Sequence, residues 1–200
     1  MNIFALHWRQ RKVARWHCDK HVVKMLLETV QLLYTAHWCL TYKELAAATG
    51  AQQLARLQRQ LPIPPKMETA PKNLSGSHYR PVHSFHPCAK WTRRTSGNYQ
   101  WLAKLAIELA AEFRFRYGHD HACQPHAEWL VANMPAGIRK WPRTEFVMAM
   151  DERFKISQDP IVSYRHFYRV SKGEERGLLT YTKRHIPHWL MISTNHTAEI

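Results

Sequence analysis

The sequence predicts a single compact domain that is all-α or mainly α. Apolar residues recur at helical spacing along most of the chain, and few segments show the alternation of a half-buried strand. Helix start and stop signals border several of these segments, with Asp159-Pro160 at one start and Gly118 at one end. With 200 residues and a hydrophobic fraction of 45%, the chain can bury one real core.

The longest predicted helix covers residues 15–40, and a short strand or extended arm at residues 2–6 precedes it. Residues 42–61 look helical again, with Gly50 dividing them into two pieces. Residues 62–81 are rich in proline and small polar residues, so we expect a loop there and treat it as a candidate mobile element. Later helices are expected at 98–117 with Asn98 opening the helix, at 128–133, and from Pro160 to Lys172.

Two acidic residues on the predicted helices receive structural expectations. Asp19 points toward the apolar side of the first long helix, so it should either cap that helix or meet an arginine or backbone donor inside. In the 98–117 helix, Glu112 falls on the side opposite the core face and is expected to be solvated. That core face consists of Leu102, Leu105, Leu109 and Phe113.

The charge of the chain predicts a polyanionic partner. The sequence has 29 Lys and Arg against 15 Asp and Glu, a net charge of +14. Such a balance is typical of proteins that bind nucleic acid, and we expect DNA, RNA or a nucleotide, with DNA favoured. An anionic membrane is a weaker candidate, because the basic residues are spread along the chain and no segment reaches transmembrane length.

The cysteines and the first residues predict the compartment. The four cysteines are well separated and include no C-x-x-C pair, which fits a reducing cytoplasm. The apolar run near residue 1 is too short for a signal peptide. We therefore expect a soluble cytoplasmic protein.

A polar stripe on the first long helix is the leading candidate for a reaction site. At about 100° per residue, five polar side chains fall along one line: His17, His21, Lys24, Glu28 and Gln31. Imidazole suits proton transfer near neutral pH. Glu28, one turn from Lys24, could be held ionised as a base or water-positioning group, or could help to hold an amine as a nucleophile. The simpler alternative is an ordinary solvent-exposed face.

A second dense polar stretch, at residues 83–102, adds further candidates. His86 and Asn98 join the catalytic group from this stretch. Phosphate binding is predicted for Lys20, Arg93, Arg165, Arg169, Lys172, Lys183 and Arg184, of which Arg165, Arg169 and Lys172 share one predicted helix face. Stacking on a base is predicted for Trp91, Tyr99 and Trp101.

Metal binding is the main alternative chemistry. His17 and His21 lie one turn apart and could hold a divalent metal if other side chains completed the shell. Lys20 and Lys24 flank the pair, and ammonium groups disfavour a nearby dication. No cofactor is favoured. Familiar nucleotide-binding, protease and zinc-finger motifs are absent from the sequence.

Several motifs together resemble a family of small phage and bacterial proteins. They are N-I-F, H-C-D-K-H-V-V-K-M-L-L-E-T-V-Q-L-L, H-P-C-A-K-W-T-R, N-Y-Q-W-L, F-R-Y-G, the Y-R-H-F-Y…K run and K-R-H-I-P-H-W. The resemblance covers most of the chain except residues 42–81, a region that is longer here. His7 and Trp8 stand where the family has an Asp-containing segment, which weakens any role for that turn. The resemblance implies a part in phage DNA modification or repair, including glycosylase-like activity.

The family's motif positions fall mostly on polar residues, which resembles an enzyme's site more than a packing scaffold. They are His17, Asp19, Lys20, His21, Lys24, Glu28, Gln31, His86, Cys88, Trp91, Arg93, Asn98, Tyr99, Trp101, Tyr117, Tyr164, Arg165, Lys172, Lys183 and Trp189. The sequence therefore predicts an enzyme that acts on nucleic acid or a nucleotide at a base or glycosidic bond. A metal-dependent nuclease or hydrolase and a non-catalytic DNA- or RNA-binding protein are the alternatives.

Overall fold

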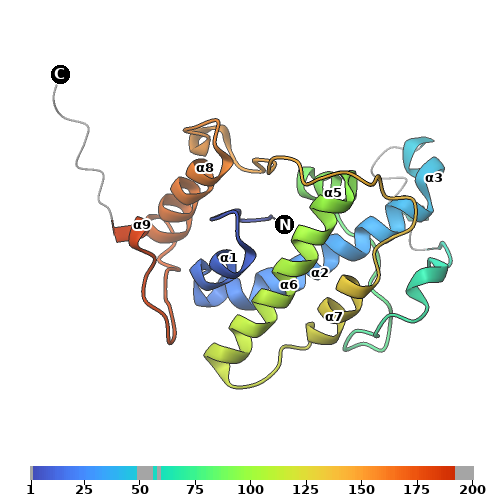
Figure 1. Ribbon diagram of the computed structural model, residues 1–200, viewed down its shortest axis with the longest axis horizontal. Helices are drawn as coiled ribbons and strands as arrows, with labels where there is room; N and C mark the ends of the chain where they lie inside the picture. The colour runs from blue at the N-terminus through green and yellow to red at the C-terminus, as the bar shows by residue number, and fades with distance from the viewer. Residues whose placement is uncertain (1, 49–55, 58–59, 192–200) are drawn as a thin grey trace.

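Two long helices, α2 (Asp19–Thr41) and α6 (Ser96–Tyr117), pack against each other at the centre of the molecule (Figure 1). The computed structural model describes residues 2–48, 56–57 and 60–191. Within these ranges the chain forms helices joined by loops and turns, without a β-strand. The predicted mainly α fold is therefore confirmed.

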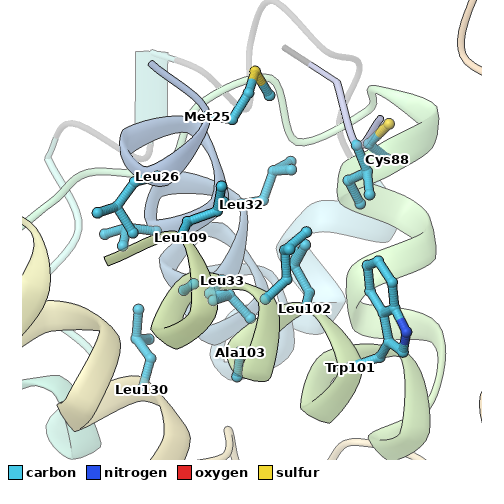
Figure 2. Close-up of a cluster of buried hydrophobic side chains, with 14 of the residues drawn as sticks. Met25, Leu26, Leu32, Leu33, Cys88, Trp101, Leu102, Ala103, Leu109 and Leu130 are labelled. Atoms are coloured by element: carbon cyan, nitrogen blue, oxygen red, sulfur yellow. The ribbon is translucent and has the colours of Figure 1, made fainter. Parts of the chain in front are cut away.

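Shorter helices surround the central pair. The core between them contains Met25, Leu26, Leu32 and Leu33 of α2 facing side chains of α5, α6 and α7 (Figure 2). The surrounding helices are α1 (Gln10–Trp16), packed on α6; α5 (Pro87–Arg94) and α7 (Gln124–Ala132), each packed on both α2 and α6; and α3 (Lys43–Ala48), next to α2.

Local capping explains why the helices begin and end where they do. The Thr95 hydroxyl accepts a hydrogen bond from Asn98 N at 3.1 Å, so Thr95 is the N-cap of α6 and the prediction that Asn98 opens this helix is wrong. Gly118 ends α6 with φ of 80°, a conformation that favours glycine. Asp159 caps α8 (Pro160–Phe167) by accepting from Ile161 N at 2.8 Å, as predicted.

The first residues form a buried extended arm, which is one of the two predicted forms. Residues 3–6 are each no more than 5% exposed. In Figure 1 this arm passes between α8 and the central helices. Arg165 Nε donates to Leu6 O at 3.0 Å, and the Tyr164 hydroxyl donates to Asn2 Oδ1 at 3.0 Å, so the arm joins α8 to the rest of the molecule.

The C-terminal third departs most from regular α-helix. After α8 the chain continues as a π-helix, η3 (Tyr168–Glu174), and a short helix, α9 (His188–Met191), follows a turn-rich segment. A single 3₁₀ turn, η2 (Glu152–Phe154), precedes α8. The π-helix changes the angular position of every side chain after Phe167 relative to an unbroken α-helix.

The predicted loop at 62–81 is anchored on the core. It contains a 3₁₀ turn, η1 (Pro65–Met67), and otherwise turns and extended backbone. Met67 is fully buried, and Tyr79 O accepts from Trp38 Nε1 at 3.0 Å. Before this loop, α3 accounts for the start of the predicted 42–61 helix, while Gly50 lies outside the described residues.

Candidate functional site

The chain breaks between α1 and α2, within the helix predicted at 15–40. His17 ends α1 with ψ of 136°, and Cys18 precedes α2 with ψ of 165°, so both are extended. The Cys18 amide, which has no helical partner at this break, donates to the Tyr168 hydroxyl at 2.7 Å. The prediction of one continuous helix is wrong at its N-terminal end, and the break turns His17 toward η3.

The polar stripe of α2 is largely covered. His17 and His21 are 1% and 6% exposed, and the Glu28 side chain is 12% exposed. The Lys24 side chain, in contrast, is 68% exposed. The alternative that the stripe is an ordinary solvent face is therefore wrong for the histidines. Apart from Thr41 at its last position, the exposed residues of α2 are Lys20, Val23, Lys24 and Leu27, a face rotated from the predicted one.

The two histidines pack into an aromatic cluster beside the arm. The Phe4 ring stacks on His21 with 4.7 Å between centroids, and the Tyr168 ring meets His17 and His21 edge-on at 6.1 and 5.1 Å. His17 Nδ1 is 2.7 Å from Val13 O. His21 Nδ1 is buried and has no hydrogen-bond partner among the described residues.

Burial keeps both imidazoles uncharged at neutral pH. It lowers the pKa of His17 to about 4, where nearby Arg116 also contributes, and the pKa of His21 to about 3, assisted by His17 and by the cations Lys172 and Lys24. Neither ring can act as an imidazolium acid near pH 7. Each can still donate or accept one hydrogen bond as a neutral ring.

Lys172 joins this cluster from η3. The residue is 8% exposed, and Nζ lies 4.6 Å from the centroid of Phe167 and 5.7 Å from that of Phe4. Its hydrogen-bonding contact is a long one, 3.5 Å to Ser171 Oγ. Burial lowers the pKa of Lys172, and the positive charges of Arg176 and Lys24 lower it further. We call Phe4, His17, His21, Tyr168 and Lys172 the histidine–lysine cluster.

Glu28 lies further along α2, where the two dense polar stretches of the sequence meet. Its carboxylate accepts from Asn2 N at 3.1 Å and pairs with Lys24 Nζ at 3.2 Å. Its negative charge also acts on His86, raising a pKa that burial lowers. His86 caps α5, with Nδ1 accepting from Cys88 N at 3.1 Å. The structure thus brings Glu28 and His86, two of the predicted site residues, into one neighbourhood.

The contacts of Asn98 do not connect it to the neighbourhood of Glu28 and His86. It is fully buried, and its Nδ2 donates to Trp91 O at 2.8 Å and to Thr144 Oγ1 at 3.0 Å. Its Oδ1 accepts from Thr144 N at 2.8 Å. Because both ends of the amide are used to hold the 144 segment on α6, the contacts describe a structural residue.

The predicted stacking residues are also inside the protein. Trp91, Tyr99 and Trp101 are 4%, 1% and 6% exposed, respectively. Their polar atoms bond to backbone oxygens: Trp91 Nε1 to Glu145, the Tyr99 hydroxyl to Leu130, and Trp101 Nε1 to Trp8. A base cannot stack on rings packed in this way, so the prediction of base stacking is wrong for this conformation.

Two of the predicted phosphate ligands line a cleft on α8. Arg165 and Arg169 face a cavity of about 210 Å³, and the Arg165 guanidinium lies 5.5 Å from the ring centroid of Trp189. Lys172 is not on this face, because the π-helix that begins at Tyr168 turns it toward the histidines. The other residues lining the cleft are Ile156, Val162 and His166.

The remaining basic candidates are dispersed. Lys20 is exposed at the start of α2, and Arg93 is half-buried on α5. Lys183 Nζ donates to Phe115 O at 3.4 Å, at the end of α6. Arg184 forms two short bonds to Glu112, of 2.8 and 2.7 Å. The contacts of these residues do not join them to the α8 cleft in one surface.

A buried ionic network holds the ends of α1, α2 and α6 together. The Arg116 side chain is fully buried and donates to Glu112 Oε1 at 2.7 Å, to Asp19 Oδ1 at 3.0 Å and to Arg15 O at 3.0 Å. Glu112 is 4% exposed, so the prediction that it is solvated is wrong. Asp19 also accepts from Thr182 N, which confirms its predicted structural role.

The family resemblance, a metal site and membrane insertion received no support from the structure or from comparison with known proteins. Among the described residues, no three His, Cys, Asp or Glu side chains are grouped as a metal would require. In the same ranges, no helix is both long and apolar enough to cross a membrane. No family model, curated protein or solved structure matches the chain.

Proposed function

We propose that this protein is an enzyme that acts on nucleic acid, with DNA favoured, or on a nucleotide, at a base or glycosidic bond. The observation that carries the proposal is the juxtaposition on one chain segment of an arginine-lined cleft and a buried reactive cluster. Arg165 and Arg169 line the cleft, and Lys172, one turn further, belongs to the cluster with His21. Trp189, which lines the cleft, contacts Tyr168 of the cluster with 6.2 Å between ring centroids, so the cleft and the cluster are separated by one pair of aromatic rings.

Charge supports an anionic ligand. The chain carries +14, and guanidinium groups bind phosphate oxygens through directed hydrogen bonds. The half-buried indole of Trp189 borders the same cleft beside Arg165. A cation next to an indole is a suitable surface for a nucleotide, with phosphate on the guanidinium and base or sugar on the ring.

Glu28 and His21 supply the proposed chemistry. The Glu28 carboxylate, paired with Lys24 and mostly covered, is placed to orient a water molecule or accept a proton. Neutral His21 has a buried nitrogen free to bond to a substrate. Lys24 stays exposed and can bring an anion to the edge of the cluster.

Base release measured by mass spectrometry tests the proposal. Wild-type protein is incubated with unmodified DNA, base-modified DNA, RNA and nucleotides, and we expect a released base or a changed mass. Glu28→Gln and His21→Asn should lower the rate by about 10²-fold or more, as is typical for loss of an acid–base group. Glu44→Gln, an exposed carboxylate on α3, is the matched control. If both site variants stay folded and keep the wild-type rate, the site assignment is wrong.

The α8 cleft is tested separately through the salt dependence of binding. Each phosphate contact contributes a slope of roughly one in log K against log salt concentration. Arg165→Gln and Arg169→Gln should each reduce this slope by about one, whereas Arg114→Gln, whose side chain is 65% exposed on α6, should not. Steep salt dependence without turnover on any substrate would favour the non-catalytic binding protein. Activity that a chelator abolishes and a divalent metal restores would favour the metal-dependent hydrolase.

A further inference from the structure

We infer that Lys172 is an amine nucleophile that forms an imine with a sugar aldehyde, the class of carbonyl exposed at C1′ of deoxyribose once a base has been lost. This inference rests on the proposed function and gives it a covalent step. It reassigns Lys172, which the sequence placed among the phosphate ligands, to the reacting group.

The position of the amine supports this role. Nζ lies against the rings of Phe167 and Phe4, at 4.6 and 5.7 Å from their centroids, and its polar contact is the long one to Ser171. Lysine is rarely buried without a carboxylate partner, because its charge costs free energy away from water. The two ring faces attract a cation, whereas removal from water disfavours the charged form and is the largest cause that lowers the pKa of Lys172. Removal from water therefore favours the neutral amine that a nucleophile needs.

The positive charges around Lys172 act in the same direction, whereas Glu175 and the Cys18 thiol act in the opposite one. Lys24 on α2 and Arg176 beyond η3 are both near enough to repel its positive charge. Glu175 is the nearby carboxylate, but it forms an ion pair with Arg153 at 2.9 Å. The Cys18 thiol is a further titratable neighbour, and His21 is neutral. Burial and the two cations together lower the pKa of Lys172, which enlarges the reactive fraction at neutral pH.

The cluster also offers a hydrogen-bonding group for the substrate. His21 is 94% buried, since 6% of its surface is exposed, and its Nδ1 has no partner among the described residues. Both His21 and Lys172 contact the Phe4 ring. A buried nitrogen without a partner beside a nucleophile is suited to hydrogen-bond the hydroxyl of the addition intermediate. The exposed Lys24 and Arg176 form the solvent side of this site, where a phosphate group would be attracted.

The proposed step is balanced without an oxidant or reductant. The Nζ lone pair forms a bond to the aldehyde carbon, and the carbonyl oxygen takes one proton from Nζ to give a carbinolamine. The carbon–oxygen bond then breaks, and the oxygen leaves as water with the second Nζ proton. The product is the imine, and water hydrolyses it in the reverse sense to regenerate Lys172.

Reductive trapping tests the inference on the full chain. Wild-type protein is mixed with an oligonucleotide that contains one abasic site, and borohydride reduces any imine to a stable amine. We expect a covalent protein–DNA band whose modified peptide contains Lys172. Lys172→Met should lose at least nine-tenths of the band, and Lys104→Met, on an exposed position of α6, should retain it. Circular dichroism establishes that both variants are folded.

A second probe needs no nucleic acid. Glycolaldehyde with cyanoborohydride alkylates neutral amines, and peptide mapping compares Lys172 with Lys104 in the wild-type protein. The neutral fraction of an amine rises about tenfold for each unit by which its pKa falls, so Lys172 should react faster at pH 7. This comparison uses only the wild-type protein, so it can be made even if Lys172→Met does not fold.

The outcomes separate the inference from the proposed function. If wild-type protein releases a base but no trapped adduct maps to Lys172, the inference is overturned and the proposed function stands. If Lys172 reacts selectively with glycolaldehyde but not with the abasic strand, the sugar assignment fails, and base release by the wild-type protein alone decides the proposed function. If Lys172 reacts no faster than Lys104 and traps no DNA, the amine is not a nucleophile.

Discussion

Replacing Arg116 with methionine should destabilise the protein by about 3 kcal/mol. Breaking a buried ion pair by removing one partner costs about 3–5 kcal/mol, because the other charge is left unpaired away from water. Here Glu112 keeps its two bonds from Arg184, and Asp19 keeps those from Thr182. Since both carboxylates retain partners, we expect the lower end of that range. Methionine is long enough to fill part of the vacated volume.

Urea unfolding at pH 7 measures this loss. We expect a lower midpoint with an unchanged slope of free energy against urea concentration. Arg114→Met is the matched control, since Arg114 is 65% exposed and pairs with Asp120, and it should change the free energy of unfolding by less than about 1 kcal/mol. A double-mutant cycle with Glu112→Gln should give a coupling of about 0.5–3 kcal/mol. Equal effects of Arg116→Met and Arg114→Met, or strict additivity in the cycle, would refute the reasoning.

Three further predictions concern pH, close packing and the same network. His17, His21 and His37 have pKa values lowered by burial, to about 4, 3 and 4, from an ordinary value of 6.5. Between pH 6.5 and these lowered values the unfolded chain therefore binds more protons than the folded chain, so the urea midpoint should fall as the pH drops from 6.5 toward 4. His37→Gln should make this fall of the midpoint with pH less steep. Gly97→Ala should destabilise the protein by about 1–3 kcal/mol, because the new Cβ would collide with the backbone nitrogen of Arg143. Alanine is usually the better helix former, so a lower melting temperature in thermal unfolding would show that the collision decides the effect. Burial would raise the pKa of Glu112, but hydrogen bonds from Arg184 and Arg116 hold it below 4.5. The stability that this carboxylate contributes is therefore lost as the pH falls below about 4.5. Acid titration of the Arg116→Met variant should show a smaller loss of stability than the wild-type protein.

The regular helices could be predicted because their signals are local. Leu102, Leu105, Leu109 and Phe113 recur on one helical face and are buried as expected. Gly118 and the Asp159-Pro160 pair mark an end and a start that depend on backbone conformation within a few residues. Such signals are present in the sequence regardless of what the helix packs against.

The helix break at His17 and Cys18 has no comparable signal. Helical spacing continues through it, and neither residue is a strong helix breaker. The break is stabilised by the Tyr168 hydroxyl, which is 150 residues away in the sequence. The side of α2 that faces inward was mispredicted for the same reason, because the arm at residues 2–6 and η3 cover the histidines.

The roles of the charged residues also depended on distant partners. Glu112 looked solvated by its position on an amphipathic helix, yet Arg116 and Arg184 bind it inside the protein. Arg165, Arg169 and Lys172 looked like one basic face, but the π-helix from Tyr168 separates the last from the other two. A π-helix is rare, and the helical spacing of residues in the sequence gives no indication of it.

The sequence by itself determined a mainly α chain, its helix caps, its strong positive charge and the set of polar residues worth attention. Those properties follow from local backbone preferences and from simple counts of side chains. The tertiary structure decided which of these residues are buried, which of them meet, and that Lys172 lies with His17 and His21 rather than with the arginines. Burial and pairing arise from segments distant in sequence, and they set the free energy of each charged form, so they could be known only from the folded arrangement.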